Sequence, residues 1–136
     1  MSDYQFIKSY LNDFSDLLKP NDELIEKLIQ VRDLLLEVNK NNKKILIFGN
    51  GGSAAIASHF SVDLTKNAGV RCLNFNEADL ITCFANDYGF EHWVEKAIDF
   101  YGDEGDLLIV ISSSGCSQNM LNGVKAARNG NFKSVV

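Results

Sequence analysis

The spacing of apolar residues along the chain changes near residue 43. Residues 3–18 and 22–38 carry apolar side chains every three or four positions, which is typical of amphipathic helices. Pro20 separates these two helices, because its ring cannot continue the first one. Beyond them, short continuous apolar runs take over. The pattern therefore predicts a helical lead-in over 1–42 and a β/α core over 43–136.

Four apolar runs of strand length alternate with helical segments in the predicted core. The strands are expected at 45–48, 70–73, 107–111 and 133–136, and the helices at 53–65, 78–85, 90–100 and 117–128. This alternation predicts an α/β fold with a parallel, doubly wound sheet flanked by helices. The fourth strand lies so close to the last residue that we expect a single, truncated domain of a longer protein.

Three local patterns add detail to this expectation. Residues 86–89, Asn-Asp-Tyr-Gly, have the composition of a turn that ends the helix before them. Trp93, Ala97 and Phe100 form the expected buried side of the next helix. The first helix of the chain has a wide apolar face, which we expect to contact another copy of the chain. Packing on its own sheet is the alternative.

A glycine-rich turn follows the first predicted strand. Gly49-Asn-Gly-Gly52 separates that strand from a helix that starts at Ser53. Glycine tolerates positive φ and lets the backbone approach a ligand, and the first N–H groups of a helix attract anions. The spacing differs from that of dinucleotide and nucleoside triphosphate loops. The turn is therefore either a phosphate cradle or an ordinary tight turn between a strand and a helix.

A serine-rich loop stands in the same place after the third predicted strand. Ser112-Ser-Ser-Gly-Cys-Ser117 joins the apolar run 107–111 to the next helix. Serine hydroxyls donate hydrogen bonds to phosphate oxygens without adding charge. Alternatively, Ser117 is a plain helix cap. Two such loops at the carboxyl ends of parallel strands favour a phosphorylated ligand.

Composition and charge restrict the ligands that the chain is expected to bind. The net charge is −5 and basic residues form no cluster, which argues against nucleic acid. No apolar run approaches the length of a membrane span, and the first residues do not resemble a signal peptide. The three cysteines lack the spacing of a metal site, so reduced thiols and a cytoplasmic location are expected.

His59 and Asp63 lie four residues apart on the helix that follows the glycine-rich turn. At this spacing the two side chains share one helix face and are able to ligate one metal ion. The alternative is a half-buried histidine beside a solvated carboxylate. Their place behind a phosphate cradle favours the functional interpretation.

Three motifs then follow one another along the chain. The glycine-rich turn with Ser53 is followed by His59-Phe60 and Asp63-Leu-Thr65, then by Ala85-Asn-Asp-Tyr-Gly-Phe90 and by Gly105-Asp-Leu-Leu-Ile-Val-Ile-Ser-Ser-Ser-Gly115. In this order they resemble the motifs of phosphoheptose isomerases. Those enzymes have the sugar isomerase (SIS) fold, a flavodoxin-like sheet, and convert sedoheptulose 7-phosphate to D-glycero-D-manno-heptose 7-phosphate.

The resemblance implies a function, a set of partners and a role for each matched residue. It implies a sugar-phosphate isomerase that forms a homotetramer and binds zinc through His59 and Asp63. Asp63 would also be the catalytic base. The substrate-binding residues would be Asn50, Gly51, Gly52, Ser53, Asn86, Asp87, Ser112, Ser113, Ser114 and Ser117.

The chain departs from the family pattern at three places. Asp63 stands where the family has a glutamate, and Cys116 stands where it has an asparagine. The later glutamine and histidine of the family would lie beyond Val136. These departures keep a second hypothesis open, namely a non-catalytic SIS module that binds a sugar phosphate or a protein partner such as a replication initiator.

Overall fold

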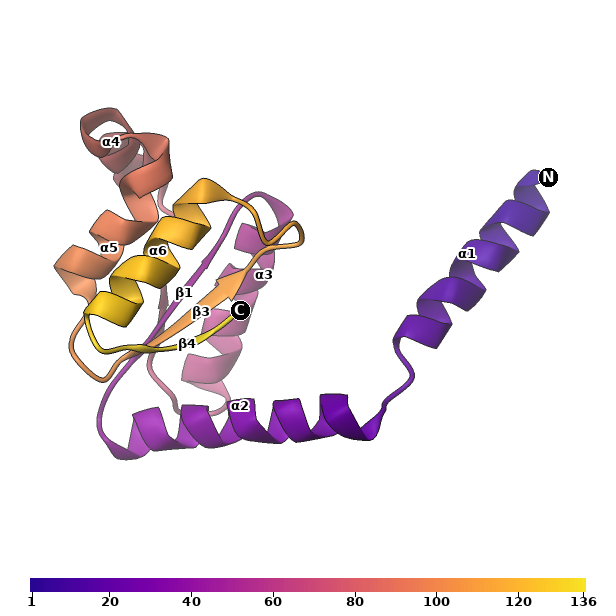
Figure 1. Cartoon of the computed structure of the whole chain (residues 1–136), viewed down its shortest axis with the longest axis horizontal. Helices are drawn as coiled ribbons and strands as arrows, with labels where there is room; N and C mark the ends of the chain where they lie inside the picture. Colours follow the sequence, from indigo (N-terminus) through magenta and orange to yellow (C-terminus); the bar gives the residue numbers. More distant parts are fainter. The chain divides into compact units, whose positions relative to one another are not determined.

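The computed structural model describes residues 1–136 and confirms the α/β architecture with a parallel sheet between helices (Figure 1). The elements in chain order are α1 (Asp3–Leu17), α2 (Asp22–Lys40), β1 (Ile45–Gly49), α3 (Gly52–Lys66), β2 (Cys72–Asn74), α4 (Ala78–Tyr88), the 3-10 helix η1 (Phe90–His92), α5 (Trp93–Tyr101), β3 (Leu107–Ile111), α6 (Gln118–Asn129) and β4 (Lys133–Val135).

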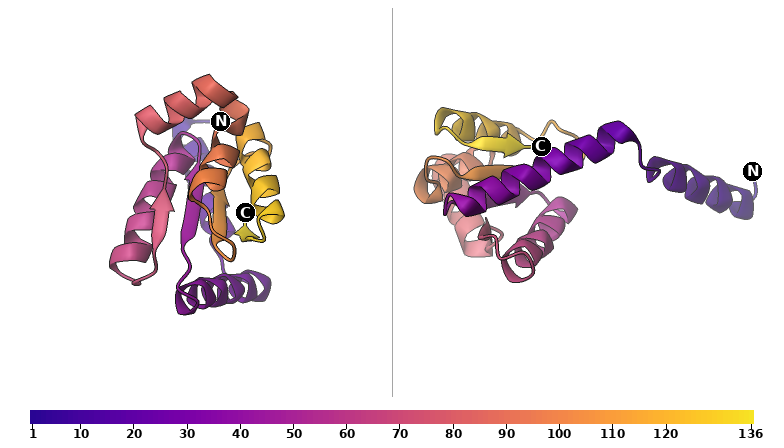
Figure 2. Two further views of the ribbon diagram at one scale, coloured as in Figure 1. Left: turned by 90° about the vertical axis from the view of Figure 1, so that its left-hand side faces the viewer. Right: turned by 90° about the horizontal axis from the view of Figure 1, so that it is seen from below.

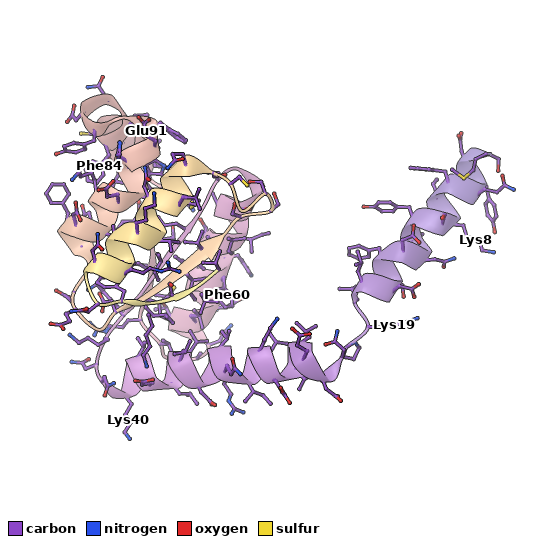
Figure 3. The ribbon with its side chains drawn as sticks, in the orientation of Figure 1. Lys8, Lys19, Lys40, Phe60, Phe84 and Glu91 are labelled. Carbon is purple, nitrogen blue, oxygen red and sulfur yellow. The ribbon has the colours of Figure 1, made fainter.

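Residues 1–32 and 33–136 form two compact units. The first unit consists of α1 and the first part of α2. A reciprocal capping box between Ser2 and Gln5 starts α1, on which Lys8 is labelled in Figure 3. The helix buries no residue, and Ile7, Leu11 and Phe14 on its apolar face are each more than half exposed. No helix in the chain combines the length and the apolar character that a membrane span requires.

The sheet in the second unit has the strand order β2-β1-β3-β4, and every neighbouring pair is parallel. The chain therefore moves to one side after β1 and crosses back past it to form β3. Ligands of such sheets bind where the order reverses, at the carboxyl ends of the two central strands. Gly49 pairs with Ile111, so the loops after β1 and β3 start at the same level and leave the same end of the sheet (Figure 1).

Two apolar clusters cover opposite faces of this sheet, and the alternation of side chains along the central strands separates them. Leu46 and Phe48 of β1 face α5 and α6, whereas Ile45 and Ile47 face α3 and the end of α2. Figure 2 shows α6 and α3 on opposite sides of the sheet. Because both faces are covered, β1 and most of β3 are buried, as their continuous apolar sequences predict.

A buried carboxylate joins the amino ends of β1 and β3. This end of the sheet is opposite to the end from which the two loops leave. Asp106, which is 1% exposed, accepts hydrogen bonds from the backbone N–H groups of Lys44 at 3.0 Å and Asp103 at 2.9 Å. It also forms a 2.6 Å ion pair with Lys44 Nζ, which contacts Asp103 as well. Burial lowers the pKa of Lys44, but hydrogen bonds and charges from the two aspartates outweigh burial and raise this pKa.

The structure corrects two expectations about α4 and α5. Asn86 and Asp87 were expected in a turn, but α4 continues to Tyr88 and stops only at Gly89, whose φ is +93°. The rings of Phe84 and Tyr88, 5.9 Å apart and one helical turn from each other, support this extra turn. Phe100 is 61% exposed rather than buried, because the buried face of α5 includes Val94 and Ile98 and is rotated away from it.

The second strand begins later than the apolar pattern predicts. Val70 is buried but precedes β2, because Gly69 has a φ of +67° and the Val70 N–H donates to the carbonyl of Leu64 in α3. Asn74, one residue beyond the expected strand 70–73, is the last residue of β2 and pairs with Ile47. The apolar residue at position 70 thus closes the turn after α3 and does not pair in the sheet.

Candidate functional site

The glycine-rich turn brings the end of β1 very close to the start of α3. A Cβ atom on Gly49 would lie 2.5 Å from the carbonyl carbon and oxygen of Ser53, a separation that only glycine permits. Gly51 has a φ of +53°, which favours glycine for a different reason. The N–H of Ser53 already donates to the carbonyl of Asn50 at 3.0 Å. The N–H groups of Gly51 and Gly52 lie before this bond, where a helix offers no internal acceptor.

In the serine-rich loop after β3, two serine hydroxyl oxygens accept hydrogen bonds from backbone N–H groups of the same loop. Ser112 Oγ accepts from the N–H of Gly115, and Ser114 Oγ accepts from the N–H of Cys116, each at 3.2 Å. Gly115 has a φ of +64°, which turns the backbone between these two bonds. Since the hydroxyl oxygens act as acceptors here, their O–H hydrogens remain available for donation to an anion.

Ser117 occupies the N-cap position of α6 but makes no side-chain capping bond. Ser117 therefore stands at the cap position, as predicted, but its hydroxyl does not cap the helix. Ser113 is exposed at the tip of the same loop. The loop thus presents hydroxyls together with the unpaired first N–H groups of α6, which is a favourable setting for an anion.

A pair of asparagine side chains joins the glycine-rich turn to the start of α6, which follows the serine-rich loop. Asn50 Nδ2 donates to Asn119 Oδ1 at 3.0 Å, and Asn119 Nδ2 donates back to Asn50 Oδ1 at 2.9 Å. Asn119 lies in the first turn of α6 and is 3% exposed. Nothing in the sequence pattern singled it out, because its partner is 69 residues away and the contact depends on the strand order.

Asn86 and Asp87 lie on the last turn of α4, where both are exposed. Asn86 Nδ2 donates to Asp87 Oδ1 at 2.9 Å, and the Cys83 thiol lies 3.7 Å from Asp87 Oδ2. The charge of Asp87 is the main reason why the pKa of Cys83 is raised. These contacts are local to α4, and no hydrogen bond joins Asn86 or Asp87 to either loop.

His59 and Asp63 share an exposed face of α3, with Nε2 and Oδ2 3.6 Å apart. His59 is highly exposed, and Asp63 also accepts from Asn67 Nδ2 at 3.1 Å. A helix rises about 1.5 Å per residue, so Asp63 lies about 16 Å along α3 from Gly52, at the start of the helix. Phe60, next to His59, is accordingly seen well along α3 (Figure 3). The pair is therefore separated from the two loops.

The chain does not assemble a complete metal site around this pair. Zinc sites in proteins use three or four protein ligands, drawn mostly from cysteine, histidine and carboxylates. No group of three or more such side chains in the chain is arranged to hold a metal ion. His59 and Asp63 supply two donor atoms, so a zinc ion there would need further ligands.

Comparison with known proteins places the chain in a family. Residues 9–136 match the family described as SIS domain. The phosphoheptose isomerase of Fusobacterium nucleatum is 36% identical over 129 residues, which cover 90% of this chain and 66% of the relative. That of Aliarcobacter butzleri is 34% identical over 135 residues, which cover 95% of this chain and 71% of the relative.

Two solved structures have the same fold over nearly the whole chain. The phosphoheptose isomerase of Neisseria gonorrhoeae superposes with a TM-score of 0.81 at 33% identity and covers 96% of this chain. The enzyme of Francisella tularensis gives a TM-score of 0.89 at 29% identity. The chain spans 69% and 73% of these two proteins and 56% of the curated Neisseria gonorrhoeae relative. The chain therefore belongs to the phosphoheptose isomerase family of SIS-domain proteins.

Proposed function

We propose that the protein is a sugar-phosphate isomerase, which interconverts sedoheptulose 7-phosphate and D-glycero-D-manno-heptose 7-phosphate or a similar pair of phosphorylated sugars. The observation that carries this proposal is the meeting of two anion-type loops at the point where the strand order reverses, with Gly49 level with Ile111. The names of the relatives support the substrate class. The chain's net charge of −5 suits a site built from N–H and hydroxyl donors.

In this proposal the two loops hold the phosphate and the first part of the sugar. The residues assigned to binding are Asn50, Gly51, Gly52, Ser53, Ser112, Ser113, Ser114 and Ser117, with Asn86 and Asp87 assigned to sugar hydroxyls. Backbone N–H groups at helix starts and serine O–H groups bind phosphate without a basic side chain. In a heptose 7-phosphate the reacting carbons C1 and C2 lie at the other end of the sugar from this phosphate.

The proposed chemistry is a proton transfer between C1 and C2. A base removes a proton from C1 of the ketose while the C2 oxygen takes up a proton, and an enediol forms. The base then returns its proton to C2 while the C1 hydroxyl gives up its proton, so that C1 becomes the carbonyl carbon of the aldose. We assign the base to Asp63, which stands where the family has a glutamate and lies on the helix that starts at the glycine-rich turn. A zinc ion held by His59 and Asp63 would need ligands beyond this pair, so no step is derived through it.

The decisive experiment is an isomerisation assay. Purified protein is mixed with sedoheptulose 7-phosphate, and formation of the aldose phosphate is followed by proton NMR. We expect conversion to an equilibrium mixture, with solvent deuterium incorporated at C2 when the base exchanges its proton with water. A protein that binds the sugar phosphate but never converts it would contradict the isomerase proposal.

One observation favours a second candidate, a binding module without catalysis. Asp63 and His59 lie far along α3 from the loops, and no third ligand or base lies beside them. A phosphate site without a nearby base binds a sugar phosphate and leaves it unchanged. Calorimetry that detects binding, together with an NMR assay that detects no conversion, would select this candidate.

The serine-rich loop gives a prediction about affinity. Replacing Ser112 or Ser114 by alanine removes a hydroxyl donor, and each change should weaken sugar-phosphate binding by about 1.5–3 kcal/mol, as expected for hydrogen bonds to a charged group. Isothermal titration calorimetry measures the effect, with Ser134→Ala on β4 as the control. Unchanged affinity in the Ser112→Ala/Ser114→Ala double variant would place the phosphate elsewhere.

We further propose that the protein forms a homo-oligomer, as a tetramer. The apolar face of α1, with Ile7, Leu11 and Phe14, is wide and exposed, and closed symmetric assemblies cover such faces. Light scattering coupled to size exclusion should give four times the mass of the chain. The variant Ile7→Asp/Leu11→Asp should reduce this mass, whereas Lys8→Asp on the same helix should not. A parent protein that is monomeric at micromolar concentration would refute the proposal.

A further inference from the structure

We propose that Asn119 is a positioning residue, which holds the glycine-rich loop against the serine-rich loop so that both bind one and the same sugar phosphate. The inference rests on the proposed function of these loops. It concerns a buried side chain that donates to and accepts from Asn50 across 69 residues of sequence.

The hydrogen bonds leave the two amides in different situations. Each primary amide has two N–H donors and two acceptor lone pairs, and the reciprocal pair uses one of each on both sides. Asn50 is partly exposed, and the pair leaves its second N–H and second lone pair unused. Asn119 is 3% exposed and has no open surface of its own. Asn119 therefore acts on a ligand only through Asn50.

Asn50 connects the starts of two helices that lie on opposite sides of the sheet. Its backbone carbonyl accepts from the N–H of Ser53, at the start of α3, and its side chain reaches the first turn of α6. On α6, Asn119 stands two residues after Ser117 and next to Met120, which is buried in the core. The core thus fixes α6, α6 fixes Asn119, and Asn119 fixes the loop that follows β1.

This arrangement predicts different effects on the binding of inorganic phosphate and of a sugar phosphate. Inorganic phosphate is small enough to be held by the serine-rich loop and the start of α6. A sugar phosphate also contacts the glycine-rich loop, so it requires the two loops in register. Loss of the asparagine pair should therefore weaken binding of the sugar phosphate and spare binding of inorganic phosphate, a split that general damage to the fold does not produce.

The test is a double-mutant cycle on the whole protein, with sedoheptulose 7-phosphate and inorganic phosphate as probes in calorimetry. Asn119→Ala should weaken sugar-phosphate binding about tenfold, since it leaves a polar group of Asn50 without its partner. Its affinity for inorganic phosphate should stay within about twofold of the parent. In an Asn50→Ala background, Asn119→Ala should have no further effect, because it acts through Asn50. Asn122→Ala, one turn along α6, is the matched control.

Several outcomes would overturn the inference. Equal losses for both probes in Asn119→Ala would indicate general damage, and unchanged sugar-phosphate affinity would remove the positioning role while the proposed function stands. Additive losses in the cycle would mean that Asn119 does not act through Asn50. If Asn119→Ala does not fold, Asn119→Ser keeps a polar group but is too short to reach Asn50, and the same results decide. A parent protein that binds neither probe refutes the inference and the proposed function together.

Discussion

Replacement of Asp63 by asparagine is expected to lower the turnover of the isomerisation by about 10²–10⁴-fold, the range that one general base contributes. The change keeps the shape of the side chain and removes both its charge and its ability to take a proton. The affinity for sugar phosphate should hardly change, because Asp63 lies about 16 Å along α3 from the start of the helix, where the proposed phosphate site lies. Loss of turnover without loss of binding identifies a group used in the transition state.

Steady-state kinetics with and without a chelator measure this effect. Asp63→Glu should retain activity, since it restores the residue that the family has at this place. Asp99→Asn on α5 is the control, because that carboxylate pairs with Lys96 and faces solvent. If Asp63→Asn turns over like the parent, another group is the base. If the chelator alone abolishes turnover, a metal takes part whose further ligands lie outside the His59–Asp63 pair.

Replacement of Asp106 by alanine is expected to lower the free energy of unfolding by about 3–5 kcal/mol, as when one partner of a buried ion pair is removed. The variant leaves Lys44, whose side chain is largely buried, without its buried ion-pair partner. It also leaves the backbone N–H groups of Lys44 and Asp103 without their acceptors. Urea denaturation followed by circular dichroism measures the change.

Asp103 provides the matched control, because it pairs with the same Lys44 ammonium from an exposed position. Asp103→Ala should cost much less stability than Asp106→Ala, and equal losses would contradict the central role of the buried carboxylate. The hydrogen bond and charge of Lys44 lower the pKa of Asp103. Its contribution to stability is therefore present above about pH 4 and is lost as the pH falls through the lowered pKa.

The apolar pattern predicted the sheet well because continuous burial leaves a clear trace in a sequence. The runs 45–48 and 107–111 became the two central strands, since both faces of each are covered by helices. The prediction from turn composition failed at the end of α4, where a glycine and one contact between rings determine the boundary. Asn86 and Asp87 have turn composition, yet α4 continues because Gly89 and the Phe84–Tyr88 contact place its end later.

Within the candidate site, the sequence predicts the positions of the two loops, because their residues are contiguous, follow a strand directly and precede a helix. Asn119 was missed, since a single asparagine in the first turn of a helix has no distinctive pattern. The separation of Asp63 from the loops was also missed, although helix geometry alone implies it: two residues on one helix face are not equally near to what binds at its start.

The pairing of β1 with β3 also determines when the site arises during folding. Lys44 and Asp106, which join the amino ends of these strands, are 62 residues apart in the sequence. The ends of so long a segment must meet before the pairing contributes any stability, so we expect local helices to form before the sheet is complete. The loops after β1 and β3 therefore lie side by side only in the finished fold. On the proposed function, a sugar phosphate that needs both loops binds that state alone, so we expect its concentration to shift the folding equilibrium toward the folded state by mass action.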